Sequence, residues 1–138
     1  MKTVLLFLVL FLTLAVSVYA QEPDRGDLSL LKGMTKVYLK GNAEHYKAAE
    51  KELAKRFTVV NTARDAQFYF DCRSLNTRVV PPSGMSLETA ECEAYVIRDN
   101  KVIVWSHSNT DGAFGGVTAK NLAKRFVKDF VKFHENPK

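Results

Sequence analysis

Two cysteines are the residues whose spacing points most directly to chemistry. Cys72 and Cys92 lie 20 residues apart, and the turn-forming run Pro81-Pro82-Ser83-Gly84 stands midway between them. A chain that reverses there brings both thiols together on adjacent strands, and an oxidising compartment then joins them. The alternative, a redox or nucleophilic thiol, calls for a Cys-x-x-Cys motif or an activating base, and the sequence has neither nearby. We therefore predict a structural disulfide between Cys72 and Cys92.

A polar run over residues 106–116, SHSNTDGAFGG, is the second candidate site. His107 and Asp111 could join a serine in a hydrolytic site, although such a run more often forms a solvated loop, and no Gly-x-Ser-x-Gly elbow is present. Its glycines precede a predicted helix, whose free backbone N–H groups suit a small anion. A flexible link between strand and helix is the plainer interpretation. The candidate anion-binding residues are Gly112, Gly115 and Gly116.

A basic ridge follows on the last predicted helix, where lysines recur every four residues. Like charges at this spacing repel by a few tenths of a kcal/mol per pair, which suggests an anionic partner such as a lipid headgroup, a polysaccharide or an acidic protein. A solvated helix face is the alternative. Nucleic acid is not expected, because basic and aromatic residues do not interleave on a strand. The ridge consists of Lys120, Lys124, Arg125, Lys128 and Lys132.

The three histidines favour neither a metal nor a cofactor. His45, His107 and His134 are scattered, with no pair at the spacing of a zinc motif. Two cysteines are too few for a site of four thiolates. We therefore assign no catalytic residue, metal ligand or cofactor from the sequence.

The N-terminus predicts export. Lys2 precedes an apolar run over residues 4–18, and Val18-Tyr19-Ala20 has the form of a cleavage site. An uncleaved anchor is the alternative, but this run is shorter than the roughly 20 apolar residues of a membrane span. We expect a cut after Ala20, no transmembrane anchor afterwards, and a secreted or periplasmic protein.

Length and composition indicate one domain. The 138 residues are 46% hydrophobic and 25% charged, with a net charge of +5, which excludes a disordered chain or a coiled coil. Residues 1–20 form the signal peptide. Residues 21–33 are polar at first and read as a flexible lead-in, and residues 34–138 form the single domain.

The apolar pattern predicts a strand, a helix and a strand in the first half of this domain. Residues 35–40 alternate as in a strand, and Asn42 can cap a following helix. A β-branched strand begins at Thr58, so the three elements suggest a βαβ unit. The apolar stripe of the helix comprises Tyr46, Ala49, Leu53 and Phe57.

The second half predicts antiparallel strands at 66–72, 92–97 and 102–105, with a tight turn over 98–101. Pairing Ile97 with Val102 sets Ala94 opposite Trp105. It also directs Ala94, Val96, Ile103 and Trp105 toward the helices. The final helix starts at Thr118 and buries Ala119, Leu122, Phe126, Phe130 and Phe133. The expected fold is α+β, a mixed, mostly antiparallel sheet of order β-α-β-β-β-β-α with two helices on one face.

The run KVYLK…YKAAEKELAKRFTVVNTARDAQFYFDC resembles small bacterial envelope proteins. It is similar to the α/β domains of the TolB amino-terminal type and of the curli-secretion and penicillin-binding-protein-activator lipoproteins, over residues 35–105. The chain departs from these lipoproteins in lacking a lipidation cysteine after its apolar run. The resemblance implies a binding or assembly module with an envelope partner and carries over no catalytic position.

Two hypotheses of function follow. The first is a secreted or periplasmic, non-catalytic binding module of unknown partner, which uses its open sheet face or its basic helix. The second is a small exported enzyme of hydrolase type with a site in residues 106–116. An exposed patch with Tyr69, Tyr95 and Val104 would favour the binding module, whereas a cleft that joins His107 or Asp111 to a distant polar side chain would favour the enzyme.

Overall fold

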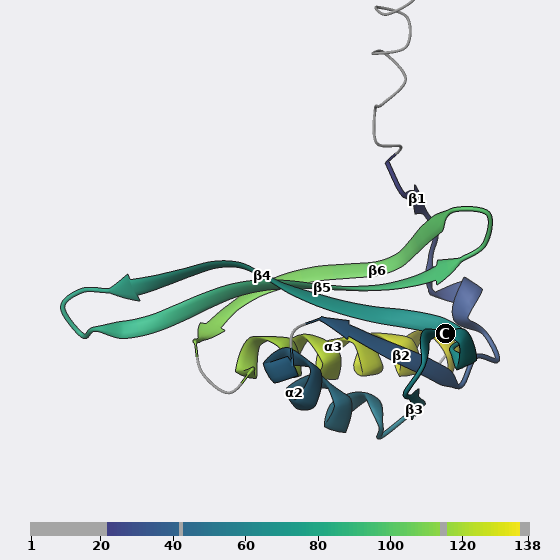
Figure 1. Cartoon of the computed structure of the whole chain (residues 1–138), viewed down its shortest axis with the longest axis horizontal. Helices are drawn as coiled ribbons and strands as arrows, with labels where there is room; N and C mark the ends of the chain where they lie inside the picture. Colours follow the sequence, from purple (N-terminus) through teal and green to yellow (C-terminus); the bar gives the residue numbers. More distant parts are fainter. Residues whose placement is uncertain (1–21, 42, 114–115, 136–138) are drawn as a thin grey trace, which may run out of the picture.

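A six-stranded sheet with two helices on one face makes up the body of the protein (Figure 1). The computed structural model describes residues 22–41, 43–113 and 116–135, with the backbone alone for residues 43–46. The predicted α+β class is confirmed. In chain order the elements are β1 (Asp24–Arg25), the 3-10 helix η1 (Leu28–Leu31), β2 (Lys36–Gly41), α2 (Ala43–Leu53), β3 (Thr58–Val60), the 3-10 helix η2 (Ala63–Asp65), β4 (Phe68–Val80), β5 (Met85–Ile97), β6 (Lys101–Gly112) and α3 (Val117–His134).

The sheet is mixed, as expected, with the strand order β1-β6-β5-β4-β2-β3. β2 pairs in parallel with both β3 and β4, so β2, α2 and β3 form the predicted βαβ unit. β4, β5 and β6 are antiparallel neighbours. A short β1 adds a parallel edge beside β6, which the sequence pattern did not indicate.

The segment before residue 34 is packed into this body. Leu28 and Leu31 of η1 are buried, and Asp27 caps η1 by accepting a hydrogen bond from the Ser29 backbone N–H at 2.8 Å. Two buried apolar side chains thus hold residues 28–31 against the body, although the polar residues before them predicted a flexible lead-in. The packed part of the domain begins upstream of the predicted boundary.

The three antiparallel strands are longer than predicted. β4 continues from residue 72 to Val80, β5 starts at Met85, and β6 runs to Gly112. Residues 106–112 therefore lie in a strand, and their assignment to a loop is wrong. Each has a partner on β5, as in the 2.7 Å hydrogen bond between the Thr89 and Thr110 hydroxyls. Polar residues form strand here because the pairing extends past the apolar core.

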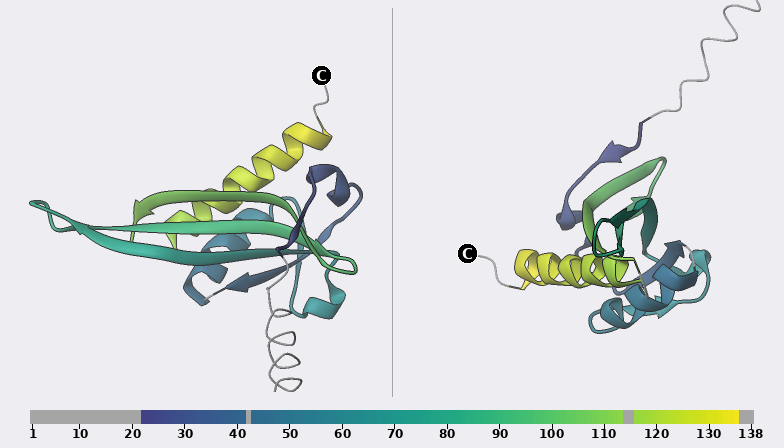
Figure 2. Two further views of the ribbon diagram at one scale, coloured as in Figure 1. Left: turned by 90° about the horizontal axis from the view of Figure 1, so that it is seen from above. Right: turned by 90° about the vertical axis from the view of Figure 1, so that its left-hand side faces the viewer.

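The hairpin of β4 and β5 projects past the helices as an arm (Figures 1 and 2). Its turn falls at residues 81–84, as the sequence predicts. β6 follows β5 only as far as the Leu87–Gly112 pair, so the end of the arm is two-stranded. We call residues 79–87 the arm tip.

A β-bulge changes the predicted faces of the β5–β6 hairpin. Ala94 lies opposite Trp105 as predicted, but the register shifts by one residue before Tyr95, which pairs with Ile103. The extra residue, Val104, joins the hydrophobic core in place of Ile103. The predicted inward position of Ile103 is therefore wrong. A bulge inserts one residue into one strand and reverses the alternation beyond it.

The core is a cluster of aromatic rings between the two layers. Phe126 of α3 is fully buried and its ring lies 5–6 Å from those of Phe68, Phe70 and Trp105. Phe57 follows the end of α2 yet is still buried, whereas Phe133 is 48% exposed, contrary to its predicted place in the buried stripe. That position lies in the last turn of α3. The expected roles of Asn42 and of the Tyr46 side chain lie outside the described residues.

Candidate functional site

The two cysteines form the predicted disulfide. Cys72 of β4 lies directly opposite Cys92 of β5, with a Cα–Cα distance of 4.1 Å. Both are buried, on the face of the sheet that the helices cover. The bond places the folded chain in an oxidising, extracytoplasmic compartment. It is closed off from solvent, as a structural disulfide is.

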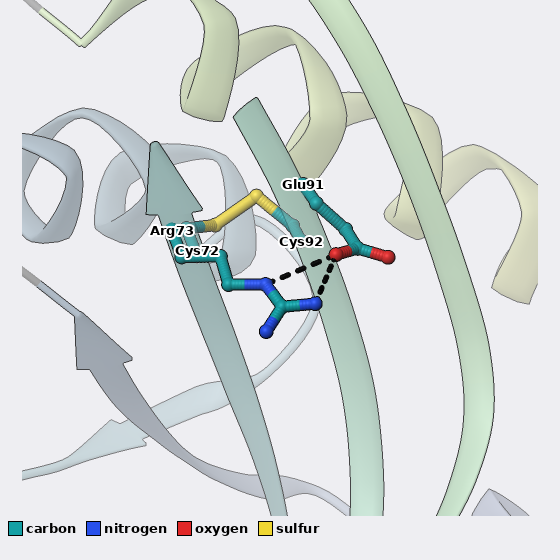
Figure 3. Close-up of a disulfide and its surroundings, with 4 residues drawn as sticks. All are labelled: Cys72, Arg73, Glu91 and Cys92. Atoms are coloured by element: carbon teal, nitrogen blue, oxygen red, sulfur yellow. Dashed lines mark hydrogen bonds and ion pairs between the residues drawn. A yellow bond between two sulfur atoms is a disulfide. The ribbon is translucent and has the colours of Figure 1, made fainter. Parts of the chain in front are cut away.

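An ion pair occupies the neighbouring positions on the opposite face of the same strands (Figure 3). Arg73 donates from Nε and Nη2 to one Glu91 oxygen at 3.0 and 2.5 Å, and the Ser106 hydroxyl donates to the other at 3.2 Å. The hydrogen bonds from Arg73 lower the pKa of Glu91 below its ordinary value. All acceptor oxygens of this carboxylate are thereby occupied.

The next residues on this open face are also engaged with one another. Lys101 forms an ion pair with Glu93 and places its Nζ 4.4 Å from the centre of the Tyr95 ring. Asp71 lies beside Glu93 across the strands, and burial raises the pKa of Asp71. The positive charge of Lys101 is thereby paired within this part of the face.

Three tyrosines complete the open face. The Tyr69 ring stacks on Tyr95 at 5.1 Å and meets Tyr38 edge-on at 6.3 Å, while its hydroxyl donates to the Ala63 carbonyl. Tyr95 is only 5% exposed, and burial raises its pKa to about 12. Val104 lies in the core. The exposed patch of Tyr69, Tyr95 and Val104 that would have marked a binding face is therefore not formed.

A hollow between the two helices is lined by four lysines, two glutamates and two alanines. Its volume is about 940 Å³, and it runs along α2 and across to the first turn of α3. We call its lysines the lysine groove. They are Lys47 and Lys51 of α2, Lys55 just after α2, and Lys120 of α3.

One of the two acidic side chains of the hollow is paired with a lysine. Glu52 is 6% exposed and accepts a 2.8 Å hydrogen bond from Lys55, which lowers the pKa of Glu52. Lys120 and Lys124 lower it further through their charges. The lysines themselves are exposed. Glu50 also lines the hollow, so its negative charge offsets part of the positive charge of the lysines.

Only part of the predicted basic ridge contributes to this hollow. Lys120 lines it and Lys124 lies close enough to act on Glu52, whereas Arg125 lies 3.9 Å from Asp129 on its own helix. Lys128 and Lys132 are exposed. The other lysines of the hollow, Lys47, Lys51 and Lys55, were not predicted as a site, although they recur at the same four-residue interval.

The residues of the hydrolytic hypothesis are not brought together. His107 packs against Trp105 at 4.9 Å between ring centres, and Asp111 accepts hydrogen bonds from Asn109 and Asn121. Four residues of extended strand separate the two by about 13 Å. Within the described ranges, no three metal-binding side chains cluster together.

The predicted anion-binding glycines are spread over two elements. Gly112 ends β6, and Gly116 precedes α3 with a left-handed φ of 66°. Gly115 lies outside the described residues. The carbonyl of Gly116 accepts the Lys120 N–H at 2.9 Å, which is the first hydrogen bond of the helix.

No protein-family model matches the chain, and no curated protein matches it by sequence. Solved structures are similar to it in part, at TM-scores below 0.5. A PelC dodecamer variant from Paraburkholderia phytofirmans has a TM-score of 0.40 at 9% identity, covering 78% of this chain and 89% of that one. A hypothetical protein from Chlamydia trachomatis has a TM-score of 0.46 at 8% identity, with 73% and 98% covered. A minor lipoprotein from Acinetobacter baumannii has a TM-score of 0.41 at 10% identity, with 70% and 90% covered.

Among the described helices, none is both long and apolar enough to cross a bilayer.

Proposed function

We propose that this protein is a non-catalytic binding module, secreted or periplasmic after a cut behind Ala20, whose lysine groove holds the phosphate or carboxylate groups of an anionic partner. One observation carries the proposal. Lysines from α2, from the residues just after it and from α3 line a single hollow, in which one of the two carboxylates, Glu52, is already bound by Lys55.

The arrangement favours an external anion on electrostatic grounds. Lysines four residues apart on a helix stand about 6 Å apart along its axis, within a Debye length of about 8 Å at physiological salt, so the potentials of neighbouring lysines add. Lysine is a flexible point charge, which suits a partner with several dispersed anionic groups better than one planar carboxylate. The ion pairs of the open sheet face leave no comparable excess of positive charge there.

Charge reversal tests the proposal directly. We expect the double variant Lys51→Glu/Lys120→Glu to bind a soluble polyanion, dextran sulfate, at least about tenfold more weakly at low ionic strength, since each surface lysine contributes about 1 kcal/mol toward an anionic partner. The matched control is Lys32→Glu/Arg98→Glu, which reverses the charge of two exposed basic side chains that do not line the hollow.

Both variants should keep the urea midpoint of the wild type within experimental error, which separates binding from folding. Wild-type binding should weaken steeply with added salt. Equal binding by the two double variants would refute the assignment of the groove.

A further inference from the structure

The arm tip is apolar and exposed. Among the described residues, Leu75, Val79 and Met85 of the arm are 53%, 62% and 54% exposed, and only Ile97 and Phe133 are comparable elsewhere. Residues 79–87 contain no charged side chain, while Arg78 and Glu88 flank them. Exposed apolar groups gathered at one point of a surface mark a contact site.

The apolar side chains point to both sides of the hairpin. Val79 pairs with Ser86, and the next pair, Val80 with Met85, faces the opposite way because side chains alternate along a strand. A flat protein surface would cover one side of such a wedge. A fluid apolar medium surrounds both sides.

The backbone of the turn exposes few unpaired N–H groups, as an apolar medium requires. Pro81 and Pro82 have no N–H group, and the Gly84 N–H donates to the Val80 carbonyl at 3.1 Å. The Ser83 hydroxyl donates to the same carbonyl at 2.9 Å and accepts the Met85 N–H at 3.3 Å. An unpaired backbone donor costs several kcal/mol away from water, and this turn presents few of them.

Part of the lysine groove, at Lys120 in the first turn of α3, lies near the base of the arm, whereas Lys55 lies past the other end of α2. β2 ends at Gly41 opposite Cys72, where the arm leaves the sheet, so α2 starts there. α3 also begins at that end (Figure 1). Its first turns are bonded to the base of the arm, where Asn121 donates to Asp111 of β6 at 2.8 Å.

We infer that the arm tip inserts into the boundary between headgroups and acyl chains of an anionic phospholipid bilayer, to which the lysine groove draws the protein. The electrostatic half of this inference rests on the proposed function, and the apolar half does not. Interfacial insertion of this kind reaches about 5–10 Å and combines buried apolar area with attraction to anionic lipids. Arg78, just behind the tip, is placed to extend its guanidinium to the headgroups.

Vesicle binding by the chain from residue 21 onward tests the inference, because residues 1–20 would themselves enter lipid. We expect Val79→Ser/Met85→Ser to lower partitioning onto phosphatidylglycerol-containing vesicles by about tenfold or more, in proportion to the apolar area lost. Its binding to dextran sulfate should stay at the wild-type level. The matched control Ile97→Ser/Phe133→Ser removes similar exposed area away from the tip and should bind vesicles as the wild type does.

The outcomes separate this inference from the proposed function. If Val79→Ser/Met85→Ser binds vesicles as tightly as the wild type does, the inference is overturned. The proposed anion binding by the lysine groove is tested separately, by Lys51→Glu/Lys120→Glu. A wild type that binds dextran sulfate but no vesicles also overturns the inference and supports a soluble polyanionic partner.

A tryptophan at the tip gives a second, independent readout. The emission of Met85→Trp should shift to shorter wavelength on vesicles and be quenched by brominated lipid, while Ile97→Trp should show neither change. A tip tryptophan that stays in water on the bound protein would overturn the inference.

Discussion

Tyr95 has the most strongly perturbed hydroxyl described in this protein, because it stands at the centre of a closed group of side chains. Tyr69 stacks on its ring and Lys101 lies over it. Burial, with the nearby charges of Asp71 and Glu93, raises the pKa of Tyr95 to about 12 from 10. The folded state therefore retains the phenolic proton at a pH where the unfolded chain has begun to lose it.

The consequence is a loss of stability at high pH. Between pH 10 and 12 the unfolded state binds fewer protons at Tyr95, so the free energy of unfolding falls as the pH rises. We expect urea denaturation across this range to show a shallower fall for Tyr95→Phe than for the wild type, because phenylalanine has no proton to lose. Lysine and arginine titration is common to both proteins. Parallel curves would contradict the perturbed pKa.

At the same scale, the sequence predicts some residues and misses others for a definite reason. The disulfide was predictable because Pro81-Pro82-Ser83-Gly84 fixes the midpoint of the hairpin that Cys72 and Cys92 close. The burial of Val104 in the core was not predictable. A single inserted residue reverses the alternation of inward and outward side chains without changing the apolar composition of the strand.

At the scale of elements, the close approach of β2 to β4 at the end of their parallel pairing depends on a glycine. Gly41 has a φ of 145°, and a Cβ added there would lie 2.8 Å from the Cys72 carbonyl oxygen. We expect Gly41→Ala to lower the free energy of unfolding by about 2–3 kcal/mol, from backbone strain and the clash together. Urea denaturation measures the loss.

Gly33→Ala is the matched control for this change. Gly33 also has a positive φ, 77°, but an added Cβ would have no neighbour within 4 Å. Its cost should be limited to about 1 kcal/mol of strain. Equal losses in the two variants would mean that the approach to Cys72 contributes nothing.

Whole strands were predicted well only where they cover the core. The 66–72 strand alternates because one of its faces meets the helices, as Phe68 and Phe70 do. Past Cys72 the arm has no helix beneath it, so its polar and apolar residues follow no pattern, and β6 likewise extends into a polar run. A strand that buries neither face has no periodicity to detect.

The lysine groove exists only at the scale of the whole molecule. Its lysines come from α2, from the residues just after it and from α3, and only the packing of these helices against one another and the sheet brings them to one hollow. The spacing of lysines along the chain therefore indicated a ridge on one helix but not the groove. The arm tip is a feature of the same scale, because its exposure depends on where the helices end.

The two layers of the molecule are joined at Phe126, and the last prediction concerns this residue. Its ring is fully buried and contacts five aromatic rings, from β4, β6, α3 and the segment after α2. We expect Phe126→Ala to lower the free energy of unfolding by about 3–5 kcal/mol, because these neighbours cannot all collapse into the cavity. Phe133→Ala, at a half-exposed position of the same helix, should cost less than about 0.5 kcal/mol. Similar losses in the two variants would mean that Phe126 does not join the layers. A large loss for Phe126→Ala alone, with the far-UV and near-UV circular dichroism signals lost in one transition, would show that helices and sheet unfold as one unit.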